Sequence, residues 1–267
     1  RYMLSVSLSY DITDWLNISG RVRVDNSSTK YEQKLYASSN TTLTEGSAQG
    51  FYAISKPDET QVYADALANI NKRLGDYSIV VNIGASIVDN KYDELSYRGP
   101  IRANGIPNVF NVFDLDNTQK KARQDEWEEQ TQSIFASAEV GWKSMLYLTL
   151  TGRNDWASQL ANSSSTCFFY PSIGLSAVVS EMVKLPSFVD YLKVRSSFSS
   201  VGMPYPRNLT SPTFEYDETT QTWKPKTHYP IGDLKPERTD SWELGLDMRL
   251  FKDFNLGLSW YLANTFN

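Results

Sequence analysis

The residues able to carry chemistry are few and far apart in this chain of 267 residues. It holds a single histidine, His228, and a single cysteine, Cys167. An activated nucleophile needs a neighbouring base, and a structural zinc site needs four Cys or His ligands. His228 lies beside Tyr229 and Pro230 in a long polar segment, where an exposed histidine without a catalytic role is the preferred interpretation.

The acidic residues form no recognisable site either. Asp114, Asp116 and Asn117 open like a calcium-binding loop, but Gln119 stands where that loop requires glycine. Glycoside hydrolysis needs two carboxylates that face one substrate, whereas acidic residues adjacent on an extended chain point apart. The sequence therefore predicts no catalytic residue, no metal site and no cofactor.

The composition narrows the class of protein. Hydrophobic residues make up 40% of the chain and charged residues 21%, and the mean hydropathy is −0.43. No run approaches the roughly 18 apolar residues of a membrane-spanning helix. An aromatic content of 13% argues against disorder, and a net charge of −5 predicts no nucleic-acid partner.

Most of the chain alternates between apolar and polar residues, the period of a strand with one apolar face. In one segment, Leu146, Leu148 and Leu150 alternate with Tyr147 and Thr149. About ten segments of roughly ten residues share this pattern, and ten residues tilted by ~45° rise about 24 Å, close to the ~25 Å apolar band of an outer-membrane barrel. They are 3–10, 16–24, 62–72, 77–87, 134–142, 146–153, 173–179, 192–198, 242–250 and 254–262.

Short and long connections alternate along the chain, as the periplasmic turns and outer loops of a membrane barrel do. The short ones are 11–14, 73–76, 143–144, 181–190 and 251–253, and the long ones are 26–61, 89–131, 156–167 and 202–238. The polar run 120–132 is expected to be a short solvated helix on a loop. The predicted fold is all-β: a segment of an antiparallel up-and-down transmembrane β-barrel.

Two rows of aromatic residues are expected at the membrane interfaces. Tyr10, Trp15, Trp142 and Phe254 lie near short turns, and Trp156, Tyr170, Trp242 and Trp260 lie near long loops. The side chains expected to face lipid are Leu146, Leu148, Leu150, Leu244, Leu246 and Leu258.

Two groups of residues are candidates for contact with a ligand or a partner. Charged residues of the polar row are expected to face the lumen, although for most of them ion pairing within the wall or to a plug is preferred over ligand contact: Arg21, Arg23, Arg153, Asp155, Arg195, Glu243, Asp247 and Arg249. Aromatic residues of the long loops could stack on a sugar or pack on a protein: Phe110, Phe113, Tyr205, Tyr216, Trp223 and Tyr229. The alternative that these rings only pack the loops together stays open.

Several motifs between about 145 and 267 share one family's pattern. They include Gly152-Arg-Asn-Asp-Trp156, Tyr191-Leu-Lys-Val-Arg195, Leu234-Lys-Pro-Glu237, Ser241-Trp-Glu243 and Asn264-Thr265. In these motifs the chain resembles the SusC/RagA-type TonB-dependent outer-membrane transporters of Bacteroidetes. The first half carries the alternation but no diagnostic motif.

The resemblance implies a barrel of about 22 strands plugged by an N-terminal domain. Residues 1–267 would then be part of one barrel domain, with the plug and the remaining strands absent. It also implies a non-enzymatic nutrient importer in the bacterial outer membrane, surrounded by lipid. It would take up glycan or peptide with a SusD-like surface lipoprotein, and the TonB complex would act through parts outside this chain.

Two other classes remain open from the residues alone. One is a soluble secreted β-protein, such as a sandwich or propeller that binds or cleaves glycan. The other is a passive porin or an adhesin barrel. The apolar row of side chains distinguishes a soluble β-protein from a membrane barrel. In a soluble fold this row must pack against a second layer, whereas in a membrane barrel it faces lipid.

Overall fold

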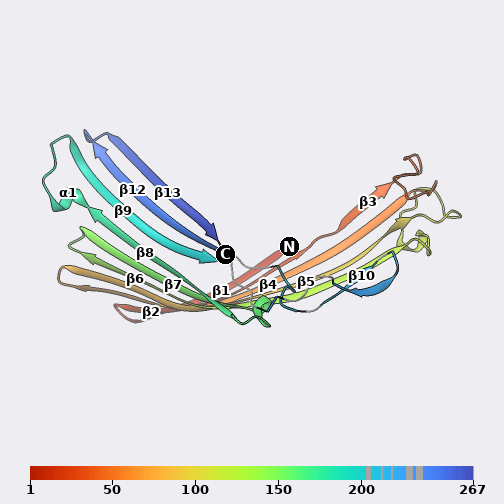
Figure 1. Cartoon of the computed structure of the whole chain (residues 1–267), viewed down its shortest axis with the longest axis horizontal. Coiled ribbons are helices and arrows are strands. Elements are labelled where there is room, and N and C mark those ends of the chain that lie inside the picture. Colours follow the sequence, from red (N-terminus) through yellow and green to blue (C-terminus); the bar gives the residue numbers. More distant parts are fainter. Residues whose placement is uncertain (203–205, 212, 218, 227–230, 233–236, 267) are drawn as a thin grey trace.

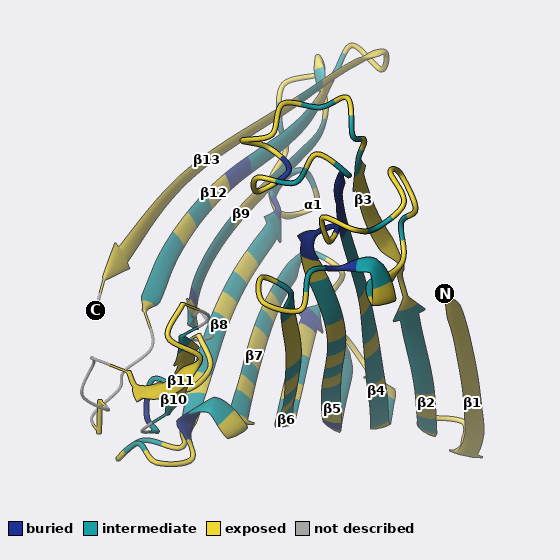
Figure 2. Cartoon of the chain, turned by 90° about the vertical axis from the view of Figure 1, so that its right-hand side faces the viewer, coloured by how far each residue is buried: buried dark blue, intermediate teal, exposed yellow. Residues whose placement is uncertain are grey.

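The computed structural model describes residues 1–202, 206–211, 213–217, 219–226, 231–232 and 237–266. Its main feature is one antiparallel sheet in which the strands follow the order β1-β2-β4-β5-β6-β7-β8-β9-β12-β13, with β3 paired to β4. Figure 1 shows this sheet as a single bent layer, and Figure 2 shows the strands side by side between β1 and β13. A small second sheet pairs β10 with β11.

Within the described ranges, ten main strands are joined as hairpins, as predicted, and three short strands, β3, β10 and β11, are additional. They are β1 (Tyr2–Thr13), β2 (Leu16–Ser28), β3 (Tyr31–Leu35), β4 (Phe51–Leu74), β5 (Tyr77–Pro100), β6 (Lys121–Trp142), β7 (Leu146–Ala157), β8 (Cys167–Val178), β9 (Val189–Gly202), β10 (Phe214–Asp217), β11 (Thr222–Pro225), β12 (Arg238–Leu250) and β13 (Phe254–Phe266). In the described part of the chain, three short helices interrupt the connections: η1 (Val112–Asp114), η2 (Ser158–Leu160) and α1 (Val179–Met182). Among the residues described, no helix has the length and apolarity needed to cross a membrane.

The alternation of short and long connections holds except around β8, where the connection after β7 (158–166) is no longer than the one after β8 (179–188). Three strands are longer than predicted. β4 and β5 have 24 residues each and β6 has 22. The expectation of loop or helix at 120–132 is wrong, because this run forms the first half of β6. Beyond the apolar band both faces of these strands are polar, so the sequence loses its alternation while the backbone ladder continues. We call residues 51–61, 89–100 and 121–131 the extension.

The register divides the sheet into an apolar and a polar face. One row across five strands joins Leu148, Leu175, Ser196, Leu244 and Trp260, so these side chains share a face. On that face Leu150 is 46% exposed and Leu258 is 55% exposed. All six leucines predicted to face lipid lie there, and within the described residues no second sheet covers them.

The prediction that Tyr170 belongs to an interfacial aromatic row is wrong. Tyr170 is the register partner of Arg153, which places it on the polar face. Trp142, Trp156, Trp242 and Trp260 lie on the apolar face as expected. The face on which a tyrosine near a strand end lies cannot be predicted from its residue type, because it depends on the strand register, which the sequence motif does not show.

A compact core lies at the outer end of β4 and β5, where Figure 2 shows buried residues. Phe51, Tyr52, Ile101 and Leu115 are at most 5% exposed there. Gly50 enters this core with φ +115°, and a Cβ at this position would lie 2.6 Å from the carbonyl oxygen of Leu35. Only glycine accepts both the backbone angle and the close approach.

Candidate functional site

The eight charged residues predicted to face the lumen lie on one face of the sheet. The row through Arg21 runs across Asp65, Ser86 and Ser133 to Asp155. Arg23 and Arg153 lie two positions from Arg21 and Asp155 on the same strands, so they share this face. The pairing of β8 with β9 and of β9 with β12 places the remaining four on it as well: Arg195, Glu243, Asp247 and Arg249. This polar face is the opposite of the leucine face.

Most of these charges are paired within the wall. Arg21 pairs with Asp65 at 2.7 Å, and Arg153 pairs with Asp155 at 2.7 Å. Arg23 donates a hydrogen bond of 3.0 Å to the side chain of Gln61. Arg21 thus pairs across two strands, whereas Arg153 and Asp155 lie two residues apart on β7.

Arg195 bridges β9 and β12 on the polar face. Its guanidinium lies 3.7 Å from Glu243 and 4.0 Å from Asp247. The side chain passes over Gly245, where any Cβ would collide with it. Within the described part of the chain, Arg249 has neither an ion-pair nor a hydrogen-bond partner.

The loop aromatics divide into packed and exposed rings. Phe110 packs against Tyr36 with ring centroids 5.1 Å apart and lies 6.1 Å from Tyr52, so it belongs to the core at the outer end. Phe113 is 87% exposed on η1, where the side chain of Asn111 caps the helix by accepting a hydrogen bond from the Phe113 amide. Phe113 is thus presented on a fixed turn.

The β10–β11 hairpin presents a second pair of rings. Tyr216 and Trp223 are register partners with centroids 5.3 Å apart, and Trp223 is 69% exposed. An ion pair between Asp217 and Lys224 closes the hairpin beside them. Three other residues singled out above, Tyr205, His228 and Tyr229, lie outside the described residues.

Sequence reasoning missed a cluster on the polar face of the extension. Tyr92 of β5 and Trp127 of β6 are register partners whose rings stack 5.4 Å apart at 10°. The guanidinium of Arg207, from the connection after β9, lies 3.6 Å from the centroid of the Trp127 ring. No local pattern marks this cluster, because residues 121–131 do not alternate between apolar and polar side chains.

Hydrogen bonds shift the protonation of tyrosines in the extension. Tyr92 donates to Glu94 at 2.6 Å, and this bond, with burial and the charge of Glu94, raises the pKa of Tyr92 to about 12. Hydrogen bonds from Tyr92 and Ser55 hold the pKa of Glu94 below its usual value. Burial and a hydrogen bond of 2.7 Å to Glu32 raise the pKa of Tyr52 to about 12.

Two long connections are joined over this cluster. Gln159 donates a hydrogen bond of 2.9 Å to Glu129, and the hydroxyl of Thr210 donates one of 3.0 Å to the Gln159 carbonyl. Arg207 lies 3.5 Å from the same Glu129 carboxylate. The segments after β7 and after β9 therefore both attach to the polar face of β6.

The acidic residues of the segment that resembles a calcium-binding loop contact other side chains of the protein. Asp114 pairs with Arg102 at 2.9 Å, and Asp116 accepts hydrogen bonds from the amide and hydroxyl of Thr118. Among the residues described, no three metal-binding side chains come together.

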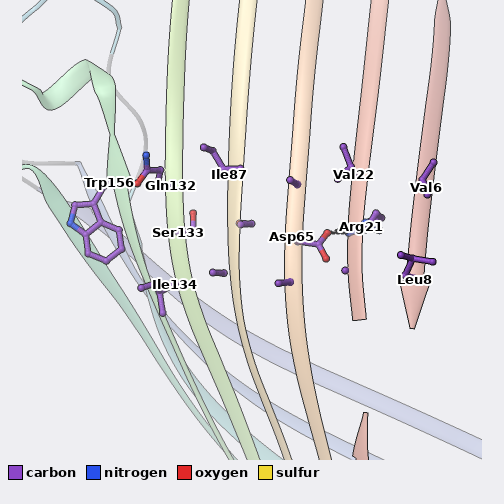
Figure 3. Close-up of a pocket in the computed structure, with 15 residues that line it drawn as sticks. Val6, Leu8, Arg21, Val22, Asp65, Ile87, Gln132, Ser133, Ile134 and Trp156 are labelled. Carbon is purple, nitrogen blue, oxygen red and sulfur yellow. Dashed lines mark hydrogen bonds and ion pairs between the residues drawn. The ribbon is translucent and has the colours of Figure 1, made fainter. Parts of the chain in front are cut away.

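A shallow groove of about 810 Å³ runs over the apolar face of the first strands. Small residues on β2, β4 and β5 form its floor, among them Gly20, Ala66 and Ala85. Figure 3 shows Leu8 on one side and Ile134 and Trp156 on the other. Its lining is chemically suited to hydrocarbon, so the polar face is the better candidate for contact with a polar ligand.

A single sheet with one exposed apolar face and one charged face defines the wall of a membrane β-barrel. The whole chain, residues 1–267, matches the family model described as TonB dependent receptor-like, beta-barrel, and the chain belongs to this family. It is therefore an outer-membrane protein, and the proteins of this family are transporters rather than enzymes. No curated protein matches the chain.

Solved structures share the fold at low sequence identity. A RagAB peptide importer in the open-open state matches with 15% identity and a TM-score of 0.76, over 98% of this chain and 30% of that one. Another structure, of the RagAB peptide transporter, matches with 13% identity and a TM-score of 0.77, over 98% of this chain and 31% of that one. The siderophore receptor PiuA from Acinetobacter baumannii matches with 15% identity and a TM-score of 0.57, over 97% of this chain and 39% of that one. The SusC/RagA resemblance is thus confirmed as a likeness of fold, and the chain spans about a third of the RagAB chains.

Proposed function

We propose that this chain forms part of the wall and outer loops of a TonB-dependent importer that takes up peptide or glycan. In this proposal residues 1–267 belong to one barrel domain, with the plug and remaining strands outside this chain. A SusD-like surface lipoprotein covers the mouth, and the TonB complex acts through parts outside the chain. The observation that carries the proposal is the asymmetry of the sheet, which has an apolar outer face, a charged inner face and aromatic rings at one end.

The position of the exposed rings supports capture at the outer end. Phe113 and Trp223 both belong to long connections, and both expose most of their side chains. Flat apolar faces of this kind stack on sugar rings and on peptide groups. The soluble alternative does not agree with the structure, because the apolar face carries no second layer within the described residues.

The test replaces Phe113 and Trp223 by alanine, singly and together, in the full-length transporter. Phe251→Ala is the matched control, because Phe251 is 68% exposed but lies in the short β12–β13 turn at the opposite end. At equal surface expression, we expect either uptake of peptide or glycan or retention of the lipoprotein to fall several-fold in the double variant. Neither should fall in the control. Unchanged uptake and retention would contradict a role of these rings.

A passive porin is the second candidate, because the polar face alone would also line an open pore. The two are separated by measuring uptake in cells with and without a working TonB complex. Uptake that is independent of TonB would overturn the importer.

A further inference from the structure

The polar face of the extension contains a seat for a positive charge. Its floor is the stacked pair of Tyr92 and Trp127, which two neighbouring paired strands hold in place. The guanidinium carbon of Arg207 lies 3.6 Å from the centroid of the Trp127 ring. A cation at this distance is attracted by the negative face of the indole.

Four carboxylates on the same face surround the two rings. Glu59 is the register partner of Tyr92, and Glu94 is the partner of Asp125. Glu129 follows Trp127 by two residues on β6 and lies 3.5 Å from the Arg207 guanidinium. Among the described residues, the cations that pair with these carboxylates are Arg207, which lies beside Glu129, and Arg123, which pairs with Asp125 at 3.1 Å. The local charge therefore favours cations.

The rings and the carboxylates belong to paired strands, whereas Arg207 comes from a long connection. Its side chain is 40% exposed, and that of Glu129 is 20% exposed. The connection has its own attachment nearby, because Thr210 is buried and bonds to the Gln159 carbonyl. The Arg207 side chain can thus leave the ring without detaching the loop.

We propose that this seat, formed by Trp127, Tyr92 and Glu129, binds the guanidinium or ammonium group of a cationic ligand that displaces Arg207. The inference rests on the proposed importer function and specifies its substrate as a peptide that carries arginine or lysine. Arg207 is an internal occupant with the same chemistry as the ligand group, so its displacement exchanges one guanidinium for another. The seat lies on the polar face of the extension.

The experiment measures binding of two peptides to the purified full-length transporter by calorimetry. One is a tripeptide with a central arginine, and the other has citrulline, which is nearly isosteric and uncharged. We expect the arginyl peptide to bind on the order of tenfold more tightly, within the usual range of a cation over an indole ring. Trp127→Leu should remove this preference.

The decisive variant is Arg207→Gln, because it removes the internal competitor. Affinity for the arginyl peptide should rise, whereas affinity for the citrulline peptide should not. Arg102→Gln is the matched control, since Arg102 is also a half-exposed loop arginine paired with an acidic residue, Asp114. A lower arginyl affinity in Arg207→Gln would show that Arg207 only fastens the loop, and would overturn the inference.

A second measurement separates this inference from the function on which it rests. If both peptides are taken up through TonB and bind equally in the parent and in Arg207→Gln, the cation seat is wrong and the importer stands. If neither peptide binds or is taken up, both are overturned. TonB-dependent uptake that favours the arginyl peptide supports both.

Discussion

Arg21 and Asp65 face each other across the β2–β4 pair, and both donating nitrogens of the arginine reach one carboxylate oxygen. The Nε to Oδ2 distance is 2.9 Å, and the Nη2 to Oδ2 distance is 2.7 Å. The Arg21 guanidinium also lies 5.2 Å from the centroid of the Tyr63 ring. Asp65 is 12% exposed and Arg21 is 52% exposed, so the pair is partly solvated.

Replacing Asp65 by Asn should lower the free energy of unfolding of the full-length barrel by about 1 kcal/mol, the upper end for a half-exposed pair. The exchanged pair, Arg21→Asp with Asp65→Arg, should recover part of this loss. Urea unfolding in detergent measures both effects. Strictly additive losses in the exchanged variant would contradict an interaction between the two residues.

Leu150 tests the lipid face. An arginine at this position should cost about 2–4 kcal/mol, because Leu150 lies between the interfacial rows of Trp142 and Trp156 and a charge near the middle of the apolar band loses its hydration. Thr149→Arg is the matched control on the opposite face, where Thr149 lies 3.3 Å from Glu139. Folding yield into lipid vesicles and urea unfolding report the difference, and equal losses would contradict the assignment of the two faces.

Gly50 tests the core at the outer end. Gly50→Ala should destabilise this core by about 1–3 kcal/mol, because alanine must adopt a positive φ and also displace the Leu35 carbonyl. Gly46→Ala is the control, since Gly46 has φ +89° but no atom within 4 Å of its Cβ position. Limited proteolysis of intact cells should cleave the Gly50 variant faster. Equal cleavage would show that the close approach carries no cost.

The wall of the barrel could be predicted from the sequence because its periodicity has a physical origin. Leu148 and Thr149 must point to opposite faces of a strand, and lipid accepts only one of them. The same logic placed Arg21 and Arg195 on one polar face although 174 positions separate them. Alternation is local information, so it survives without knowledge of the partner strands.

The extension could not be predicted in the same way. Residues 121–131 have water on both sides, so neither row needs to be apolar and the period-two signal disappears. The Trp127–Arg207 contact depends on where a long connection folds back, which no local pattern encodes. Phe110 and Phe113, three residues apart, looked equivalent in sequence, yet one is packed on Tyr36 and the other is 87% exposed.

The pair of Tyr92 and Glu94 gives a pH-dependent signature of the cation seat. Its hydrogen bond and burial raise the pKa of Tyr92 from 10.0 to about 12, so the neutral hydroxyl is favoured in the folded protein. Its contribution to stability is therefore complete below pH 10 and is lost as the pH rises towards 12. The tyrosinate absorbance of the parent minus that of Tyr92→Phe should titrate with a midpoint near 12. Glu94→Ala should bring this midpoint down, because it removes both the hydrogen bond, which is the largest cause of the shift, and the charge of Glu94. A midpoint near 10 in the parent would contradict the hydrogen bond.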